Sequence, residues 1–471
     1  MKEPTNDQLR EWDQRHYWHS FTPMADYEPL VIERAEGCTL YDIDGRAYLD
    51  AASSMWCAAL GHGHPRITAA ITDQLGKLGH CTSLGMGADV AVRLAKRLAD
   101  LAPGALQHVF FSSDGSSAIE IAMKQAFQYW RQCQEPQPTK TKFLCFGNAY
   151  HGDTIGATAV GGIGRYHEAF DPLLCEVIRA EAPCAYPPPP KGGGDEGGEE
   201  AVCPARPHPG PPPEGEGELR DALARVEAIF SEQADRIAAV IIEPLVQMAA
   251  GMLMHPGGFL RGLRELCDKH NVLLIADEVA VGLGRTGKLF ACNHEGVAPD
   301  FLCLGKHLTA GVLPMAVTIT TPQVYEAFLN RTPDEDRTFW HGHTFSGNAL
   351  AAAAAMATLD VFEEGLLDGL PAKISHLGQR LTQIAEHPSV TNPRQRGMIA
   401  AFSLNHGGGF LDERSLGRQM ARHALERGVW LRAKPDLVYV TPPLTATTEE
   451  IDRIMDVVAE CLELAATDNA G

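Results

Sequence analysis

The middle of the sequence alternates short apolar runs with longer helical stretches. Two of the runs, residues 272–279 and 301–306, are apolar almost to their ends and are bounded by turn residues. Such runs are typical of strands that are buried on both faces of a parallel sheet. Three more strand-like runs, at residues 109–111, 142–146 and 238–242, lie between helical stretches. This alternation predicts an α/β fold whose large domain contains a mostly parallel sheet.

Both ends of the chain have a different pattern. Residues 30–33 and 39–42 flank Gly37, and the pair Asp44-Gly45 follows, which is a strong hairpin signal. The C-terminal part predicts two strands on either side of a helix, at residues 397–404, 437–440 and 414–427.

A chain of 471 residues is too long for one simple core. We expect a large domain over residues 53–364, and a smaller α+β domain built from residues 1–52 and 365–471, because neither end holds a large core. Residues 183–218 are rich in Pro, Gly and Glu. Such a composition cannot bury enough apolar surface to offset its ordering entropy, so it predicts a mobile surface insertion.

Composition and charge narrow the class of protein. The formal net charge is −20 and no Lys/Arg cluster stands against it, which makes nucleic acid and anionic membrane poor partners. The N-terminus has no apolar segment typical of a secretory signal, and the alanine-rich residues 350–362 are too few to span a bilayer. The twelve cysteines form no CxxC pair, which predicts reduced thiols. We therefore expect a soluble, cytoplasmic protein.

Two reactive side chains stand at the ends of the two central runs. Asp277 follows the first run, and Lys306 follows the second in a Gly-Lys pair. Ligands of open α/β sheets bind outside the carboxyl ends of the strands, so we expect both side chains to face one crevice. Pyridoxal phosphate requires such a pair, because a lysine forms its Schiff base and an acid keeps its pyridine nitrogen protonated. Taken alone, a loop cap at Asp277 and a solvated amine at Lys306 explain the residues equally well.

A second candidate site is the small polar turn in residues 110–120, which leads from a strand into a helix. Free N–H groups, hydroxyls and the positive end of the helix dipole would converge there and suit a phosphate. Capping of the helix by Ser116 or Ser117 is the simpler alternative. Tyr150 follows another strand and could stack on a flat cofactor, although a single Tyr is more often a core residue.

The loop over residues 339–348 is rich in hydrogen-bond donors and glycine, as is typical of a loop that approaches a ligand closely. It contains a His-x-His pair, His341 and His343, and the same spacing occurs at His62 and His64. Two such pairs could also indicate a binuclear metal hydrolase. We disfavour that class and expect no metal, because neither pair follows a clear strand.

Several of these motifs together resemble the class III, fold-type I pyridoxal phosphate aminotransferases, over nearly the whole chain. They are Asp277-Glu278-Val279, Gly284-Arg285-Thr286-Gly287, Gly305-Lys306 and the glycine-rich loop to Asn348. Further segments resemble one group within that class, the adenosylmethionine-8-amino-7-oxononanoate aminotransferases, which make 7,8-diaminononanoate in biotin synthesis. These segments are residues 17–22, 53–56, 126–130, 150–154, 284–292 and 428–432.

The resemblance implies a role for each matching residue. Lys306 would form the Schiff base and move the proton, Asp277 would pair with the pyridine nitrogen, and Val279 and Tyr150 would pack below and above the ring. Arg432 would bind the substrate carboxylate, which suits a bidentate guanidinium. The other implied cofactor residues are Gly115 and Ser116 at the phosphate, His151, and His343 and Thr344 from the second subunit of a homodimer. The implied substrate residues are Phe21, Met55, Trp56, Tyr150, Lys306, Gly342, Arg432 and Tyr439.

Three residues depart from the pattern of the group. Relatives that use S-adenosylmethionine usually carry Tyr, Trp and Pro where this chain has Phe21, Met55 and His343. The missing hydroxyl and indole would contact a sulfonium-bearing, adenosyl donor. The residues present resemble a subset of relatives that takes lysine instead. The expected acceptor is unchanged, and the donor is open between S-adenosylmethionine and lysine.

The implied reaction is a ping-pong transamination. Lys306, as a neutral amine in a desolvated site, would take the proton from the amine-bearing carbon, and Asp277 would keep the ring nitrogen charged. A broad-specificity omega-amine transaminase shares all of these cofactor residues and is the main alternative. A non-catalytic scaffold would be expected to lack Lys306 or Asp277, and both are present.

Overall fold

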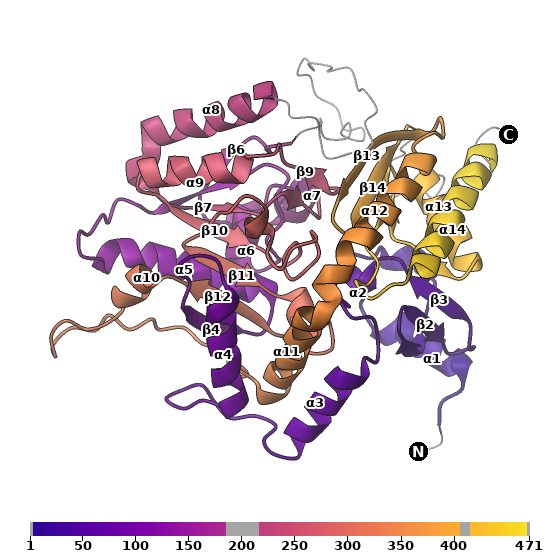
Figure 1. The fold of residues 1–471 in the computed structure, drawn as a ribbon, viewed down its shortest axis with the longest axis horizontal. Coiled ribbons are helices and arrows are strands. Elements are labelled where there is room, and N and C mark those ends of the chain that lie inside the picture. Colours follow the sequence, from indigo (N-terminus) through magenta and orange to yellow (C-terminus); the bar gives the residue numbers. More distant parts are fainter. Residues whose placement is uncertain (1–2, 185–215, 406–414, 469–471) are drawn as a thin grey trace.

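A seven-stranded sheet forms the centre of the molecule (Figure 1). The computed structural model describes residues 3–184, 216–405 and 415–468. All neighbouring strands of this sheet are parallel except β12, which runs antiparallel to both of its neighbours. The mostly parallel α/β sheet predicted from the apolar runs is therefore confirmed. In spatial order the strands are β4 (His108–Ser112), β12 (Ala316–Thr320), β11 (Phe301–Leu304), β10 (Leu273–Asp277), β7 (Ile237–Ile242), β5 (Lys142–Phe146) and β6 (Ile178–Ala180).

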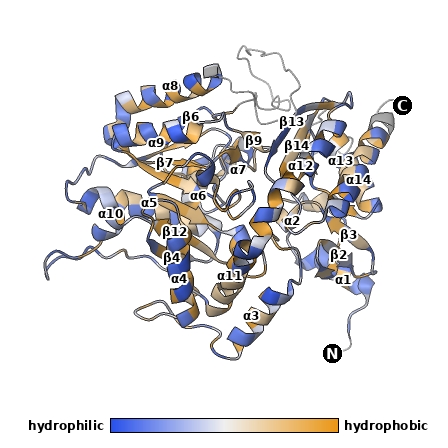
Figure 2. Cartoon of the chain, in the orientation of Figure 1, coloured by the Kyte–Doolittle hydropathy of each residue, from blue (hydrophilic) through white to orange (hydrophobic). Residues whose placement is uncertain are grey.

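The central strands are apolar along their whole length because both faces of the sheet are covered. Alternate residues of β10 belong to different cores: Leu273 and Ile275 pack on the face of α5, whereas Leu274 and Ala276 pack on the opposite face. In Figure 2 the central strands are mostly orange, while the surface helices alternate between orange and blue. Helices around the sheet are α3 (Pro65–Leu75), α4 (Asp89–Leu101), α5 (Gly115–Gln132), α6 (Ile155–Val160), α8 (Glu216–Gln233), α9 (Phe259–Lys269), α10 (Pro322–Glu326) and α11 (Ala349–Val361).

The N-terminal hairpin predicted around Gly37 is present, and it is completed by a strand from the other end of the chain. β1 (Ile32–Glu36), β2 (Thr39–Asp42) and β3 (Ala47–Asp50) pair antiparallel in order, with Asp44-Gly45 in the second turn. β15 (Val429–Trp430) then pairs parallel with β3. The hairpin and the C-terminal part therefore share one sheet, while the division of the chain into two domains stays a prediction.

A second small sheet contains both strands predicted in the C-terminal part. Its order is β13 (Val390–Arg396), β14 (Ile399–Leu404), β17 (Leu437–Val440) and β16 (Ala433–Lys434). The predicted helix is α13 (Leu416–Glu426), and it packs against the final helix, α14 (Thr448–Asp468). The remaining α-helices and strands of the described residues are α1 (Asn6–His16), α2 (Ser53–Trp56), α7 (Gly164–His167), α12 (Leu367–Ile384) and the short pair β8 (Val246–Gln247) and β9 (Leu253–Met254).

Two expectations concern segments rather than strands. Most of the predicted insertion, residues 185–215, lies outside the described residues, and its last three residues, 216–218, begin α8. The alanine-rich segment forms α11, which is buried because its small side chains let α3 and α4 pack closely against it. Across the described ranges, no helix combines the length and the apolar character that a membrane crossing requires.

Candidate active site

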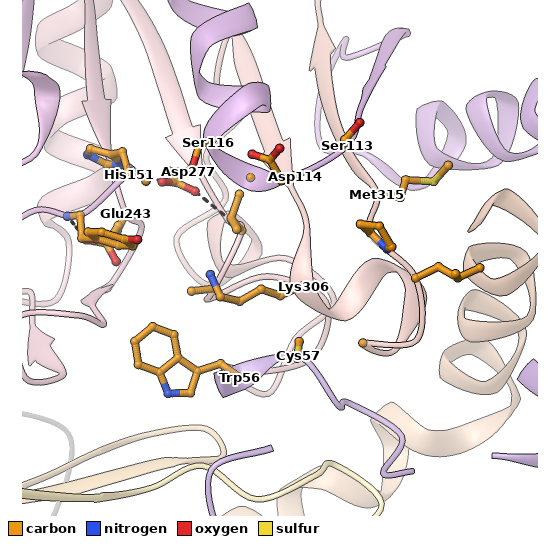
Figure 3. A pocket seen from close by; sticks show the side chains of 18 of the residues that line it. Trp56, Cys57, Ser113, Asp114, Ser116, His151, Glu243, Asp277, Lys306 and Met315 are labelled. Carbon is orange, nitrogen blue, oxygen red and sulfur yellow. Dashed lines mark hydrogen bonds and ion pairs between the residues drawn. The ribbon is translucent and has the colours of Figure 1, made fainter. Parts of the chain in front are cut away.

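A cavity of about 340 Å³ opens at the carboxyl ends of the central strands (Figure 3). Asp277 ends β10 and Lys306 follows β11, and the two strands are parallel neighbours with Asp277 in register with Cys303. Both side chains line the cavity, as the apolar runs predicted. The start of α5, Tyr150, His151 and Trp56 complete most of the wall.

Asp277 is buried and is held by two hydrogen bonds. Its Oδ2 atom lies 2.7 Å from His151 Nδ1, and its Oδ1 atom accepts from the backbone N–H of Val279 at 3.0 Å. His151, which comes after β5, is also buried, and its Nε2 atom has no hydrogen-bond partner among the described residues. The pair therefore places a well-ordered carboxylate on the cavity wall with one oxygen shared with an imidazole.

Glu243 is a second buried carboxyl group in the same wall. It follows β7, and its two oxygens accept the backbone N–H groups of Tyr150 at 3.1 Å and of Met248 at 2.9 Å. Burial raises the pKa of Glu243 to about 7, and the nearby charge of Asp277 acts in the same direction. This residue was not predicted from the sequence, although Glu243 ends an apolar run in the same way as Asp277.

Lys306 is partly buried and sits in a strained conformation. Its backbone φ is 35°, in the left-handed region that side chains other than glycine rarely adopt. Its Nζ atom lies 5.6 Å from the centre of the Trp56 ring. Desolvation lowers the pKa of Lys306, and the negative charge of Asp277 offsets part of this shift. A lowered pKa increases the neutral fraction of the amine, which is the form that attacks carbonyl carbon and accepts protons.

The helix α5, which follows the polar turn, is capped by an aspartate rather than by a serine. The cap of α5 is Asp114, which accepts from the N–H and the hydroxyl of Ser117, both at 2.9 Å. The alternative that Ser116 or Ser117 caps the helix is therefore wrong. Ser116 lines the cavity instead, and its hydroxyl accepts from the Asp153 N–H at 3.3 Å. The first-turn N–H groups of a helix have no acceptor within the helix and are suited to a phosphate.

Two glycines leave room for the side chain of Val279. A Cβ atom on Gly115 would lie 2.6 Å from Val279 Cγ1, and one on Gly305 would lie 3.2 Å from the same atom. Val279 therefore fills the space between the start of α5 and the residue before Lys306. Tyr150 also lines the cavity, and its hydroxyl donates to Asp153 Oδ2 at 2.7 Å. Burial raises the pKa of Tyr150, so its hydroxyl stays protonated.

The wall opposite Asp277 is a left-handed turn that the sequence did not predict. All four residues of α2, from Ser53 to Trp56, have φ between 45° and 68°. Left-handed conformation costs about 1–2 kcal/mol for each L-residue, and none of these four is Gly, Asn or Asp. The buried Asp50 side chain accepts from the Ala52 N–H at 3.1 Å and from the Ser54 hydroxyl at 2.8 Å, which holds the turn in place.

A second cavity, of about 810 Å³, adjoins this turn and is lined by two of the other expected substrate residues, whereas Met55, Gly342 and Tyr439 line neither cavity. Phe21 and Arg432 both line it. Arg432 Nη1 lies 2.7 Å from the sulfur of Met55, and no carboxylate pairs with Arg432 among the described residues. Met55 and Trp56 are adjacent, so one turn contacts Arg432 on one side and faces Lys306 on the other.

Aromatic rings connect the two cavities. The Tyr166 ring lies 5.7 Å from the Tyr150 ring and 5.5 Å from the Phe21 ring, measured between centroids. On the other side of the turn, the buried Tyr439 ring lies 6.1 Å from the Trp56 ring. Aromatic rings thus lie beside residues of both cavities, and apolar surface of this kind suits an aliphatic chain.

The structure does not bring the glycine-rich loop to this cavity. Gly342 and Thr344 are exposed, and the His343 N–H donates to the Ser346 hydroxyl at 3.3 Å within the loop. His343 and Thr344 were expected to act at a second subunit of a dimer and Gly342 at the substrate, and a single chain does not test either role. Phe345, beside them, is 61% exposed.

The two His-x-His pairs have other partners. His341 Nδ1 lies 3.0 Å from Lys124 Nζ, and His62 Nε2 lies 3.0 Å from Asp50 Oδ2. In the parts of the chain that the structure describes, no three or more His, Cys, Asp or Glu side chains are grouped so that they could hold a metal ion.

The comparisons with known proteins agree over almost the full length of the chain. The model of the family "Aminotransferase class-III" matches residues 22–462. The adenosylmethionine-8-amino-7-oxononanoate aminotransferase of Geobacter sulfurreducens is 44% identical to this chain over 456 residues, which cover 95% of this chain and 96% of that protein. The protein of the same name from Aquifex aeolicus is 41% identical, and the match covers 96% of each chain.

Solved structures give the same result. The crystal structure of adenosylmethionine-8-amino-7-oxononanoate aminotransferase from Methanocaldococcus jannaschii has a TM-score of 0.85 and 34% identity, covering 98% of this chain and 99% of that chain. An (S)-enantioselective omega-transaminase from Thermomicrobium roseum has a TM-score of 0.87 and 30% identity, covering 99% and 100%. This chain therefore belongs to the class-III aminotransferases.

Proposed function

We propose that this protein is a pyridoxal phosphate-dependent transaminase that converts 8-amino-7-oxononanoate to 7,8-diaminononanoate in biotin synthesis. The observation that carries the proposal is the separation of Lys306 from Arg432. Lys306 lines the first cavity, Arg432 lines the second, and the Met55-Trp56 turn lies between them. This arrangement suits a substrate whose carboxylate is remote from the reacting carbon, as in 8-amino-7-oxononanoate. The names of the relatives support the same substrate.

The residues of the first cavity fit pyridoxal 5'-phosphate. The start of α5 and the Ser116 hydroxyl suit its phosphate, and a Cβ atom on Gly115 would collide with Val279 there. The Asp277 carboxylate suits a protonated ring nitrogen, while Lys306 Nζ has no hydrogen bond within the described ranges and is available for a carbonyl carbon. When bound, the cofactor supplies a carbonyl group that takes up the amino group and a ring that delocalises the electron pair.

Each residue then has a stated task in the transfer of the amino group. The pKa of Lys306 is lowered by desolvation. Its Nζ atom accepts the proton from the amine-bearing carbon of the substrate and later donates a proton to complete the transfer of the amino group. Asp277, aligned by His151, keeps the proton on the ring nitrogen. Tyr150, Val279 and Trp56 orient the ring and exclude water from the cavity. Arg432 binds the carboxylate of the acceptor through a charged pair.

A homodimer is part of the proposal. The exposed loop that carries Gly342, His343 and Thr344 does not reach its own cavity, which supports a role at the phosphate site of a second subunit. The large side chains of Trp340 and Phe345 in the same loop are 76% and 61% exposed, as is common for residues that a partner covers.

The amino donor is proposed as S-adenosylmethionine or lysine. Phe21 lines the second cavity without a hydroxyl, and Met55 presents its sulfur to Arg432 where an indole is usual in relatives that use S-adenosylmethionine. These two substitutions support lysine, whereas the names of the similar proteins support S-adenosylmethionine.

The decisive experiment measures 7,8-diaminononanoate by mass spectrometry after incubation of the loaded protein with 8-amino-7-oxononanoate. S-adenosylmethionine and lysine are supplied in separate reactions. We expect product with at least one donor, and loss of most of it in the Arg432→Leu variant. The matched control is Arg93→Leu, on the exposed surface of α4, which should behave like the wild type. Absence of product with both donors would overturn the proposal.

A broad-specificity omega-amine transaminase is the second candidate. It is favoured by the likeness to the Thermomicrobium roseum omega-transaminase, whose TM-score is at least as high as that of the oxononanoate enzyme from Methanocaldococcus jannaschii. The two functions differ in their need for a remote carboxylate. Two results together would favour this second candidate. The protein would transfer amino groups from simple amines to pyruvate at a rate that Arg432→Leu leaves unchanged, and it would form no 7,8-diaminononanoate from 8-amino-7-oxononanoate.

A further inference from the structure

Arg285 is a fully buried arginine without a carboxylate partner among the described residues. It lies in the loop after β10, and its side chain has 0% exposure. Its Nη1 atom donates to the carbonyls of Met398 at 3.2 Å and Pro442 at 2.8 Å. Its Nη2 atom lies 3.1 Å from the Ser53 hydroxyl and 3.0 Å from His307 Nε2. Burial of an unpaired guanidinium is costly, so its retention calls for a reason other than stability.

The two side-chain partners of Arg285 each belong to a strained segment of the cavity wall. Ser53 begins the left-handed turn that ends at Trp56. His307 follows Lys306, whose φ is also positive. Strain of this kind persists only where the surrounding structure holds it, and it is concentrated at functional sites. Arg285 therefore touches both walls between which Lys306 and Trp56 face each other.

The hydrogen bonds fix the direction of each contact. His307 Nδ1 lies 2.9 Å from the Leu283 carbonyl and must donate to it, so Nε2 accepts from Arg285. Desolvation and the charge of Arg285 lower the pKa of His307 well below its usual value, which keeps the ring neutral. The Ser53 hydroxyl donates to the Thr441 carbonyl and accepts from Arg285. Without the guanidinium, the His307 Nε2 atom and the Ser53 oxygen would each lose the donor that they accept from, while their own hydrogens stay bonded to the Leu283 and Thr441 carbonyls.

We propose that Arg285 is a positioning residue for the transamination. It ties the Met55-Trp56 turn to the segment that carries Lys306 through the Ser53 hydroxyl and His307. One side chain thereby links the wall that carries the reacting amine to the substrate wall, in addition to the local contacts of Asp50 with the turn. This inference rests on the proposed function for its kinetic part, but the coupling of the two walls is a property of the protein alone.

The coupling predicts non-additive effects of two substitutions. Arg285→Lys keeps the charge but replaces a planar fork with a single ammonium group, which cannot reach all four acceptors. Ser53→Ala removes only the link to the turn. If the link runs through the Ser53–Arg285 hydrogen bond, the double variant should move the turn no further than Arg285→Lys alone.

Cys57 provides a readout that needs neither cofactor nor activity. It directly follows the turn, lines the cavity, and its thiol donates to the Ser54 carbonyl at 2.8 Å. In cofactor-free protein, the alkylation rate of Cys57 by iodoacetamide is measured by peptide mass spectrometry, relative to the exposed Cys175. We expect this rate to rise about tenfold in Ser53→Ala and in Arg285→Lys, as for loss of one hydrogen bond to a charged group, and to rise no further in the double variant.

Kinetic measurements on the cofactor-loaded enzyme distinguish an effect on the Met55-Trp56 turn from an effect on the segment that carries Lys306. Ser53→Ala should raise the KM for the oxononanoate acceptor about tenfold and leave the visible absorbance of the bound cofactor unchanged. Arg285→Lys should also lower kcat and alter that absorbance, because it reaches the Lys306 segment. Thr72→Ala, which removes an exposed hydroxyl on α3, is the control and should change none of these values.

Additive Cys57 rates in the double variant, or unchanged rates in both single variants, would overturn the proposal. If Arg285→Lys does not fold, Ser53→Ala alone decides, since an unchanged Cys57 rate with an unchanged KM contradicts the coupling. If the wild type does not aminate 8-amino-7-oxononanoate, the proposed function fails, while the Cys57 rates still test the coupling.

Discussion

Replacement of Gly115 by Ala should weaken cofactor binding through Val279. The new Cβ atom would lie 2.6 Å from Val279 Cγ1 and 3.1 Å from Cγ2. Val279 must retreat by about 0.4 Å merely to reach the 3.0 Å below which Cβ contacts are essentially never seen. On the other side, the space left by the missing Cβ of Gly305 is small, since a Cβ there would lie 3.2 Å from Cγ1. We therefore expect Val279, which lines the cavity, to be displaced partly into it.

Overpacking of this kind costs about 1–3 kcal/mol. If the full cost falls on the bound state, the Kd of pyridoxal 5'-phosphate rises about 5- to 150-fold. The assay is a titration of cofactor-free protein with pyridoxal 5'-phosphate, followed by quenching of protein fluorescence. The thermal unfolding of the cofactor-free variant is measured in parallel, because a loss of stability of the free protein would indicate that part of the cost is not specific to binding.

The double variant Gly115→Ala/Val279→Ala supplies the matched control. Without the two Val279 methyl groups, the nearest Val279 atom to the new Cβ is its own Cβ at 3.4 Å, an ordinary contact. We expect the double variant to bind the cofactor more tightly than Gly115→Ala, although Val279→Ala alone binds less tightly than the wild type. Wild-type affinity in Gly115→Ala, or a double variant that is weaker than both single variants, would refute the steric reasoning.

Further predictions concern single groups. Lys306→Ala should lower the rate of transamination by about 10²- to 10⁴-fold, the usual contribution of a proton-transfer residue, in single-turnover measurements. Arg432→Leu should raise the KM for the oxononanoate acceptor about 10- to 100-fold and leave the KM for amines without a carboxylate nearly unchanged. Desolvation lowers the pKa of Lys306, so activity should fall only when the pH drops below that lowered value. A rate that already decreases as the pH is lowered from about 10, near the ordinary pKa of a lysine, would contradict this. Burial raises the pKa of Glu278 from 4.5 to about 7, so its contribution to stability should be lost as the pH rises through 7, and Glu278→Gln should flatten the pH dependence of Tm between pH 5 and 8.

The sequence predicted those parts of the site that depend on local pattern. Asp277 and Lys306 stand at the ends of apolar runs, and the parallel pairing of the two strands brings them to one cavity. Glu243 stands directly after β7 in the same way, so the apolar run at residues 238–242 carries the signal that could have predicted it. The cap of α5 was misplaced because Asp114 and the serines around it are all good caps, and only the backbone conformation decides between them.

The left-handed turn could not be predicted, because the nearby contacts of Asp50 are joined by contacts with residues that are far away in the sequence. The Ser53 hydroxyl bonds to Arg285 and to Thr441, which are 232 and 388 positions away. Local propensity argues against four consecutive positive φ values at two serines, Met55 and Trp56. Tertiary contacts overcome that preference, and they are visible only once the fold is known.

The pairing of β3 with β15 has a consequence for the growing chain on the ribosome. Among the described residues, those that line the first cavity run from Trp56 to Met315, whereas Arg432 comes two residues after β15 and meets Met55 across 377 positions. In the proposed function, a nascent chain thus contains these lining residues of the first cavity before it contains Arg432, the residue proposed to hold the substrate's carboxylate. Until β15 has been synthesised, one edge of β3 also lacks its partner and can pair with another chain. A late segment of the chain, residues 429–432, therefore decides when the N-terminal hairpin is protected from aggregation and, in the proposed function, when the enzyme can recognise its substrate.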